Sequence, residues 1–179
     1  MCKKPRLHTA SYFSPIGNLF IIAGERALLR IDFEDERLQK KIKAVSVHNL
    51  LLKVNVASFH LHPVLLETKN WLDAYFDGNN LPPAPSIYFE DTPFRMLVWK
   101  MLLHIPYGQT ISYKELACMV AKERGIKCMS AQAIGQAVGH NPISIIVPCH
   151  RVIGSKGELT GYGGGLIRKK FLLELENRK

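Results

Sequence analysis

The stretch Ile143-Ser144-Ile145-Ile146-Val147-Pro148-Cys149-His150-Arg151 decides how the second half of this chain folds. Its β-branched apolar run stops at a proline, a pattern that predicts a short buried strand. Such a strand would deliver Cys149 to a fixed place with His150 beside it, where a thiol next to an imidazole can act as a nucleophile. A core cysteine without chemistry is the simpler alternative, because free cysteine is among the most buried residue types.

The composition is that of an ordinary globular protein, with 179 residues of which 47% are hydrophobic. This length suits one compact domain or two small ones. No apolar run reaches the length of a membrane span, and the basic start is not followed by a signal-peptide core, so we expect a cytoplasmic protein. The cysteines are widely and irregularly spaced, so they are expected to stay thiols: Cys2, Cys118, Cys128 and Cys149.

The positive charge is concentrated in the second half of the chain. From Pro93 onward there are 13 lysine and arginine residues against 5 acidic ones, a net of +8, which leaves +1 of the total of +9 for residues 1–92. A solvated basic face would explain this asymmetry. It is also the electrostatic footprint expected of a half that docks on phosphates.

The first part of the chain predicts a small α/β domain. Strand-like runs over Tyr12–Gly24 and Ala27–Phe33, punctuated by proline and glycine, favour an antiparallel meander. Apolar residues at helical spacing predict a helix over Pro63–Phe76. The proline-rich Leu81–Pro85 is a stiff extended connector, and we expect two domains, residues 1–90 and 91–179.

The second part is mainly helical. Thr92 can cap a helix that begins at Pro93, and Ser112 with Glu115 forms a capping box that opens another. Two short helices joined by a turn in a basic domain indicate a helix-turn-helix. The predicted helices cover residues 93–103, 113 to about 121, 130–138 and about 166–176.

The second helix of that pair, Ser130–Gly139, is unusually poor in bulky side chains. Only Gln132 and Gln136 could read base edges, so it would be a poor sequence reader in the major groove. A helix reduced to alanine and glycine can approach a widened minor groove. Close packing in the core is an equally good explanation of small residues.

From residue 93 onward the chain resembles the O6-alkylguanine-DNA alkyltransferases, also called methylated-DNA–protein-cysteine methyltransferases. Five motifs in family order and spacing carry the resemblance: Ile111-Ser112-Tyr113, Gly139-His140-Asn141-Pro142, Ile146–Ile153, Gly161–Leu166 and Leu172–Glu176. The first part matches only in outline. The resemblance implies an α+β fold, with a small ribonuclease-H-like α/β domain followed by a winged-helix-like domain that holds the helix-turn-helix.

The resemblance also implies a function: DNA repair by direct reversal of damage. The protein would bind double-stranded DNA through the minor groove, flip an O6-alkylguanine out of the helix and move the alkyl group to Cys149, once per molecule. His150 would accept the thiol proton through a water, and Glu176 would orient that imidazole. A solvated helix end is the alternative for Glu176.

Other site residues follow from the same resemblance. Tyr113 would donate a hydrogen bond to the base, and Asn141 would tie the small-residue helix to the active-site segment. The segments expected to hold the guanine include Val152, Tyr162, Gly163 and Gly164. The residues expected to contact DNA are Ser112, Tyr113, Ala131, Gln132, Ala133, Gly135 and Arg151.

The chain departs from the family pattern at two places. Gln132 stands where an arginine commonly inserts into the duplex, and Arg124 and Lys127 are expected to recover part of the lost charge. Some relatives carry a structural zinc in the first domain, but Gly24 and Leu29 stand at ligand positions. Cys2 with His8, and His60 with His62, are weak candidates by spacing alone, so we expect neither metal nor cofactor.

Two other function classes stay open at this stage, a non-catalytic alkyl-lesion sensor and a cysteine hydrolase with a coincidental Cys-His pair. Retention of Cys149 speaks against the sensor. Nothing marks the oxyanion hole or the sequence-distant histidine that a hydrolase needs. We expect a monomer whose partner is double-stranded DNA containing alkylated guanine, with no membrane. Alkyl size, activity on O4-alkylthymine and cooperativity on DNA are left open.

Overall fold

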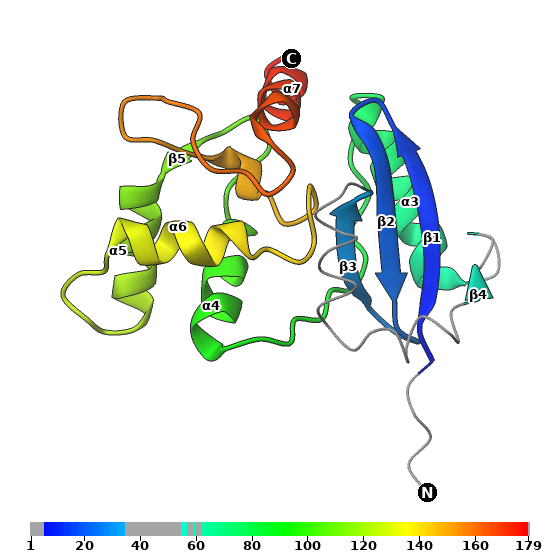
Figure 1. The fold of residues 1–179 in the computed structure, drawn as a ribbon, viewed down its shortest axis with the longest axis horizontal. Helices are drawn as coiled ribbons and strands as arrows, with labels where there is room; N and C mark the ends of the chain where they lie inside the picture. The colour runs from blue at the N-terminus through cyan, green and yellow to red at the C-terminus, as the bar shows by residue number, and fades with distance from the viewer. Residues whose placement is uncertain (1–5, 35–54, 57–58, 60–61, 179) are drawn as a thin grey trace, which may run out of the picture. The chain divides into compact units, whose positions relative to one another are not determined.

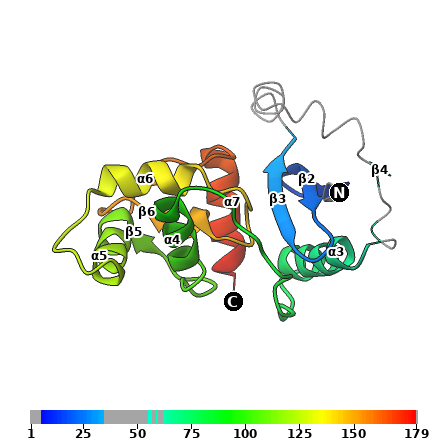
Figure 2. The same cartoon turned by 90° about the horizontal axis from the view of Figure 1, so that it is seen from below.

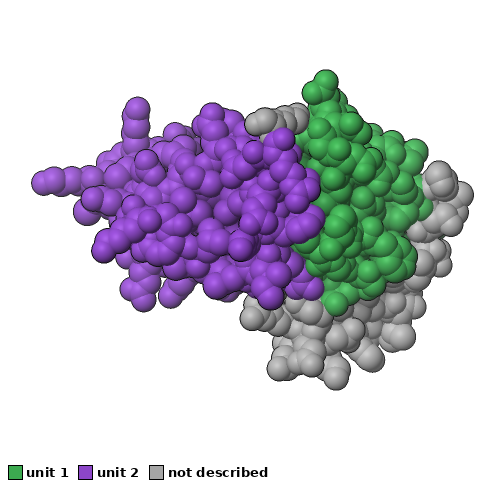
Figure 3. Space-filling model, turned by 90° about the horizontal axis from the view of Figure 1, so that it is seen from above, with its two compact units in different colours: residues 1–88 green, residues 89–179 purple. Residues whose placement is uncertain are grey.

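The computed structural model describes residues 6–34, 55–56, 59 and 62–178. The chain divides into two compact units, residues 1–88 and 89–179, which Figure 3 colours separately. The first holds a sheet and a helix, and the second is mainly helical, which confirms the predicted α+β fold of two domains. None of the helices in the described ranges combines the length and the apolar character that crossing a membrane requires.

Unit 1 is built on a sheet with the strand order β3-β2-β1-β4 (Figure 1). Its strands are β1 His8–Ser14, β2 Gly17–Ala23, β3 Leu28–Phe33 and β4 Asn55–Val56. The first three form the antiparallel meander that the sequence predicts, and β4 pairs in parallel with β1. The turn between β1 and β2 is tight, because Ser14 pairs with Gly17. Gly17 has a φ of 111°, a conformation that favours glycine.

Helix α3 (Pro63–Phe76) covers one face of this sheet, as the views in Figures 1 and 2 agree. It has the bounds predicted from its apolar spacing, and its Leu65, Leu72 and Tyr75 are fully buried. The hydroxyl of Tyr12 on β1 donates to Asp73 Oδ1 at 2.9 Å. The amphipathic pattern therefore builds the core of unit 1 by burying one helix stripe against the sheet.

Unit 2 contains the helices α4 Pro93–Leu102, α5 Tyr113–Glu123, α6 Ala131–Gly139 and α7 Leu166–Glu176. Helices α4 and α5 begin at the capping residues predicted from the sequence. The Thr92 hydroxyl accepts from the amide of Arg95, and Ser112 and Glu115 form a reciprocal capping box. Helices α5 and α6 form the helix-turn-helix and both pack against α4, where Trp99 Nε1 donates to the carbonyl of Ala137 at 2.9 Å.

A two-stranded parallel sheet joins distant parts of unit 2. Strand β5 (Ile111–Ser112) leads directly into α5, and β6 (Val152–Ile153) directly follows the 3-10 helix η2 (Cys149–Arg151). Ile111 pairs with Val152, and Ser112 pairs with Ile153. This pairing brings the start of α5 beside the segment that carries the cysteine.

The predicted strand over residues 143–146 is wrong. The run is buried, as expected of its apolar residues, but it folds into successive tight turns that end in η2. Ile145 has a φ of 73°, and the amide of Val147 donates to the carbonyl of Ile143 within the segment. The physical reason is the side chain of Asn141, which bonds both groups of Ile143 and the carbonyl of Val147 and so takes the place of a partner strand.

Candidate active site

Cys149 begins the 3-10 helix η2 and is only 5% exposed. Burial raises the pKa of its thiol, although the Asn141 amide, the Lys169 ammonium and the backbone amides of Cys149 and His150 act in the opposite direction. Cys118 and Cys128, by contrast, are exposed. The buried thiol therefore needs a base to become a nucleophile at neutral pH.

His150 lies beside it, fully buried, and its Nε2 is 2.7 Å from Oε1 of Glu176 on α7. Burial lowers the pKa of this imidazole, and the bond to Glu176 opposes that shift. A neutral ring bonded to an ionised carboxylate carries its proton on Nε2, which leaves Nδ1 as the basic nitrogen. The predicted pair of His150 and Glu176 is thus in contact, and Glu176 is not a solvated helix end.

The same carboxylate is held by Arg151. The guanidinium donates from Nε to Oε2 at 2.9 Å and from Nη2 to Oε1 at 3.0 Å, while the amide of Gly108 donates to Oε2 at 3.0 Å. Burial alone would raise the pKa of Glu176, but the bonds from His150 and Arg151 lower it to about 2. Glu176 is therefore an anion throughout the physiological range.

The expectation that Arg151 contacts DNA needs correction. Its side chain is buried, and besides Glu176 it donates from Nη1 to the carbonyl of Ile105 at 2.6 Å. A guanidinium committed to a buried carboxylate and a carbonyl is not available to phosphates. Arg151 instead supplies the positive charge that allows the carboxylate behind His150 to stay ionised in the interior.

Asn141 lies two residues after the end of α6 and connects this helix to the cysteine. Its Nδ2 donates to the carbonyl of Val147 at 2.8 Å and lies 3.0 Å from Sγ of Cys149. Its Oδ1 accepts from the amide of Ile143 at 3.0 Å. One buried side chain therefore fixes both the turn that replaces the predicted strand and the position of the sulfur.

Tyr113, at the start of α5, faces the glycine-rich segment. Its hydroxyl donates to the carbonyls of Thr160 and Gly161 at 3.1 and 3.2 Å. Burial and a charge on Cys149 both raise its pKa, so it remains a neutral donor. A Cβ at Gly161, whose φ is 49°, would come within 3.3 Å of this hydroxyl, which explains why a glycine suits this position.

The residues expected to hold the base differ in exposure. Val152 and Tyr162 are buried, Gly164 is buried and Gly163 is exposed. The ring of Tyr162 meets that of His150 edge-on at 6.5 Å between centroids, and burial raises the pKa of its hydroxyl well above the usual value.

Lys169 is the residue that sequence reasoning missed. It is fully buried on α7, and its Nζ donates to the carbonyls of Val152 and Thr160 at 2.5 and 2.7 Å. Burial lowers its pKa to about 8, and a charge on Cys149 opposes this shift. The available signal was helical spacing, because residues 169, 172 and 176 lie on one inward face of α7.

The residues expected on the DNA-binding face lie where the helix-turn-helix is exposed. Ala131 and Gln132 are exposed, Ala133 and Gly135 are half-buried, and the buried face of α6 is formed by other residues. A Cβ added to Gly135 would make only ordinary contacts, 3.8 Å from the ring of Tyr113. Core packing therefore does not require a glycine at position 135.

The supporting charges lie close by on the connection between these helices. Arg124 and Lys127 are exposed, although the guanidinium of Arg124 lies over the ring of Phe94, 5.9 Å from its centroid. Ser112 is half-buried, and its hydroxyl accepts from the amide of Glu115 in the capping box.

Taken together, fold and site define a class of protein: a sheet-and-helix unit and a helix-turn-helix unit in which a buried cysteine is followed by a histidine–carboxylate pair. The model of the "6-O-methylguanine DNA methyltransferase, DNA binding domain" matches residues 93–178, and the "ribonuclease-like domain" model of the same name matches residues 7–82. The chain belongs to the 6-O-methylguanine DNA methyltransferase family.

Individual relatives agree along nearly the whole chain. The methylated-DNA–protein-cysteine methyltransferase of Methanosarcina barkeri is 40% identical over 167 residues, which cover 91% of this chain and 92% of the relative. That of Haemophilus influenzae is 36% identical over 95% of this chain and 86% of the relative. The solved structure of Mycobacterium tuberculosis OGT in complex with DNA is 36% identical with a TM-score of 0.74, covering 95% of this chain and 92% of that one.

Proposed function

We propose that this protein repairs double-stranded DNA by moving the alkyl group of O6-alkylguanine to the sulfur of Cys149, once per molecule. Its relatives carry the name methylated-DNA–protein-cysteine methyltransferase. Because no step of the transfer frees the sulfur again, the protein is consumed by its own reaction. The observation that carries the proposal is the buried sulfur of Cys149 beside the His150–Glu176 pair, held 3.0 Å from Nδ2 of Asn141.

The first step is formation of the thiolate. Burial raises the pKa of Cys149, so the thiol must lose its proton when the alkylated guanine is bound. We assign Nδ1 of His150 as the proton acceptor, acting through a water. Glu176 is anionic, so it stabilises the imidazolium that forms without taking the proton itself. The charge of Lys169 stabilises the thiolate.

The second step is displacement at carbon. The sulfur forms a bond to the alkyl carbon while the carbon–oxygen bond breaks, and the electron pair of that bond stays on the guanine. The base leaves more easily when the negative charge on its ring is neutralised, for which Tyr113 is the assigned donor. Its hydroxyl must then exchange the carbonyls of Thr160 and Gly161 for the base.

Helix α6 is the assigned minor-groove element. The exposed Ala131 and Gln132 and the half-buried Ala133 and Gly135 present little bulk, which suits close approach of the helix to the duplex. Gln132 would occupy the space that the flipped base leaves, and Val152, Tyr162, Gly163 and Gly164 would line the pocket. Flipping costs a few kcal/mol and less for a damaged base, so the lesion itself contributes to selectivity.

The alternatives are less well supported. A lesion sensor needs a pocket but no acceptor, and would have no use for a buried thiol with an imidazole and an ionised carboxylate behind it. A cysteine hydrolase needs a step that frees the sulfur from a carbonyl adduct. We further propose a monomer that acts in the cytoplasm, a location supported by the thiol state of the described cysteines.

Mass spectrometry with an O6-methylguanine duplex separates the three functions. Alkyl transfer gives a gain of one methyl group per chain and never a second turnover, and Cys149→Ala abolishes the gain while Cys118→Ala, at an exposed cysteine, keeps it. Tight binding without a mass change would replace transfer by sensing. Repeated turnover of an ester or peptide would establish the hydrolase instead.

A further inference from the structure

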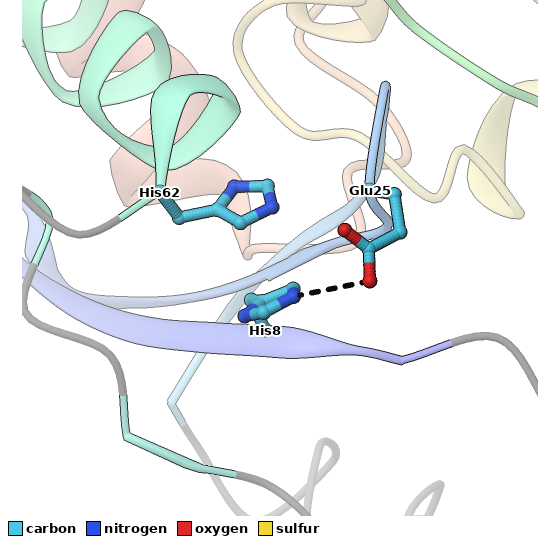
Figure 4. Close-up of side chains that lie close together, drawn as sticks. All are labelled: His8, Glu25 and His62. Carbon is cyan, nitrogen blue, oxygen red and sulfur yellow. Dashed lines mark ion pairs between the residues drawn. The ribbon is translucent and has the colours of Figure 1, made fainter.

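Three potential metal ligands from three separate elements meet in unit 1. His8 lies on β1, Glu25 follows β2, and His62 is the residue before α3. One ligand atom from each residue lies within 4.8 Å of those of the other two. Figure 4 shows both imidazoles with a ring nitrogen on the side of the Glu25 carboxylate.

The contacts within this cluster are too long for hydrogen bonds. Nε2 of His8 is 3.8 Å from Oε1 of Glu25, and the two imidazole centroids are 4.1 Å apart. Among the described residues, the buried nitrogens Nε2 of His8 and Nδ1 of His62 have no hydrogen-bond partner. Buried polar atoms without partners destabilise a fold. A bound group that accepts both nitrogens as ligands would remove this cost.

The imidazole of His62 is not used by the helix that it precedes. It makes no capping hydrogen bond to α3, although its residue is only 6% exposed. The carboxylate of Glu25, whose side chain is 60% exposed, can move to adjust its distance. The cluster therefore combines an imidazole that is held in the interior with a carboxylate that has room to adjust to an ion.

We propose that His8, Glu25 and His62 bind one divalent transition-metal ion, with Zn²⁺ as the best match. Imidazole nitrogen and carboxylate oxygen bind zinc at about 2.0–2.2 Å in tetrahedral geometry, so neighbouring donors lie roughly 3.4 Å apart. Nε2 of His8 and Oε1 of Glu25, at 3.8 Å, need to approach only slightly to reach this spacing. Ca²⁺ and Mg²⁺ require oxygen ligands and do not suit two imidazoles. Three protein ligands leave a position for water.

Such an ion would link the start of α3 to β1 and to the turn after β2, and would therefore stabilise unit 1. Sequence reasoning expected no metal because Gly24 and Leu29 occupy the ligand positions of some relatives. The cluster uses different residues, which spacing alone could not bring together. Cys2 and His60, the other weak candidates, lie outside the described residues.

The test is a Co²⁺ and Zn²⁺ titration of the full chain, stripped with a chelator, in a Cys118→Ser/Cys128→Ser background that removes the two thiols exposed in the described part of the chain. We expect one Co²⁺ per chain, visible in its d–d absorption and displaced by Zn²⁺, without the near-ultraviolet band of thiolate ligands. Zn²⁺ should also raise the melting temperature. His62→Gln and Glu25→Gln should each weaken binding by at least about 10-fold.

His104→Gln is the matched control, because His104 is an exposed histidine in unit 2. It should bind as tightly as the parent. Glu25→Gln changes an exposed side chain and keeps the test valid if His62→Gln fails to fold, which melting curves without metal will show. Absence of a stoichiometric site in the parent, or equal affinity in the parent and in Glu25→Gln, would overturn the proposal.

Discussion

The molecule contains two histidine–glutamate groups that differ in how the carboxylate is held. Nε2 of His150 is 2.7 Å from Glu176, which is buried and clamped by Arg151. Nε2 of His8 is 3.8 Å from Glu25, whose side chain is 60% exposed. A clamped carboxylate fixes one tautomer and one orientation of the imidazole, as a proton acceptor requires. The exposed carboxylate of Glu25 does not fix the imidazoles of His8 and His62 in this way, so their nitrogens can bind an ion.

Removal of the clamped carboxylate should have the largest effect. Glu176→Gln leaves the guanidinium of Arg151 buried without its counter-charge, so we expect a loss of about 3–5 kcal/mol in the free energy of unfolding. Loss of imidazole orientation should slow alkyl transfer by about 10²–10⁴-fold. Denaturant unfolding and single-turnover kinetics measure the two. Glu174→Gln, at an exposed position on the same helix, is the control and should match the parent.

Acid should act on the same group. The pKa of Glu176 is about 2 in the folded protein against an ordinary 4.5, so the unfolded chain binds the proton more tightly. Its contribution to stability is therefore complete above about pH 4.5 and is lost as the pH falls through 2. Urea unfolding between pH 6 and 2 should show a smaller loss in Glu176→Gln than in the parent. Equal slopes would contradict the assignment of a depressed pKa.

Loss of the donor at the start of α5 should have an intermediate effect. Tyr113→Phe removes a hydroxyl that now donates to two carbonyls, and we expect transfer to slow by about 10²-fold because the departing guanine loses a hydrogen bond. Binding of unmodified duplex should change little. Tyr88→Phe, at an exposed tyrosine of unit 1, is the control and should match the parent. If Tyr113→Phe transfers at the parental rate, the hydroxyl does not assist departure of the base.

A smaller effect is expected on the exposed face of α6. Gln132→Arg adds a charge where the family commonly has arginine, and should increase the magnitude of the salt slope of DNA binding by about 1. Gln136→Arg, also exposed on α6, tests whether any added charge suffices. Fluorescence anisotropy across a salt series measures both. Equal slopes for the two variants would show that position 132 has no special place in the duplex.

A change in the group formed by His8, Glu25 and His62 should have the smallest effect on repair. His62 lies in unit 1, whereas the residues assigned to the reaction lie in unit 2, so the single-turnover rate of His62→Gln should equal that of the parent. A folded His62→Gln protein that transfers alkyl groups at least tenfold more slowly would show that the two histidine–glutamate groups do not act independently.

Local signals in the sequence predicted most of the fold. The capping residues Thr92 and Ser112 and the apolar spacing of α3 act over a few residues, so the helices could be located from the chain alone. The prediction of a strand over residues 143–146 is wrong because a nearby polar side chain competes with strand pairing. The side chain of Asn141 supplies the hydrogen bonds that a neighbouring strand would have given.

The site was predictable to the same extent. Cys149, His150 and Glu176 were found from a motif and a resemblance, and their contact required the fold to bring α7 to η2. Arg151 was misassigned because a basic residue in a basic half suggests phosphate, whereas its partner, Glu176, is distant in sequence. Lys169 was missed because a lysine in a charged helix is usually solvated, and only the fold buries it.

The most direct test of the central claim is the position of the label after reaction with two alkylating agents. We predict that an O6-methylguanine duplex modifies only buried Cys149, whereas iodoacetamide at neutral pH modifies exposed Cys118 and Cys128 first. Peptide mapping by mass spectrometry shows both patterns. A methyl group transferred from the duplex to Cys118 or Cys128, with Cys149 unmodified, would contradict the account.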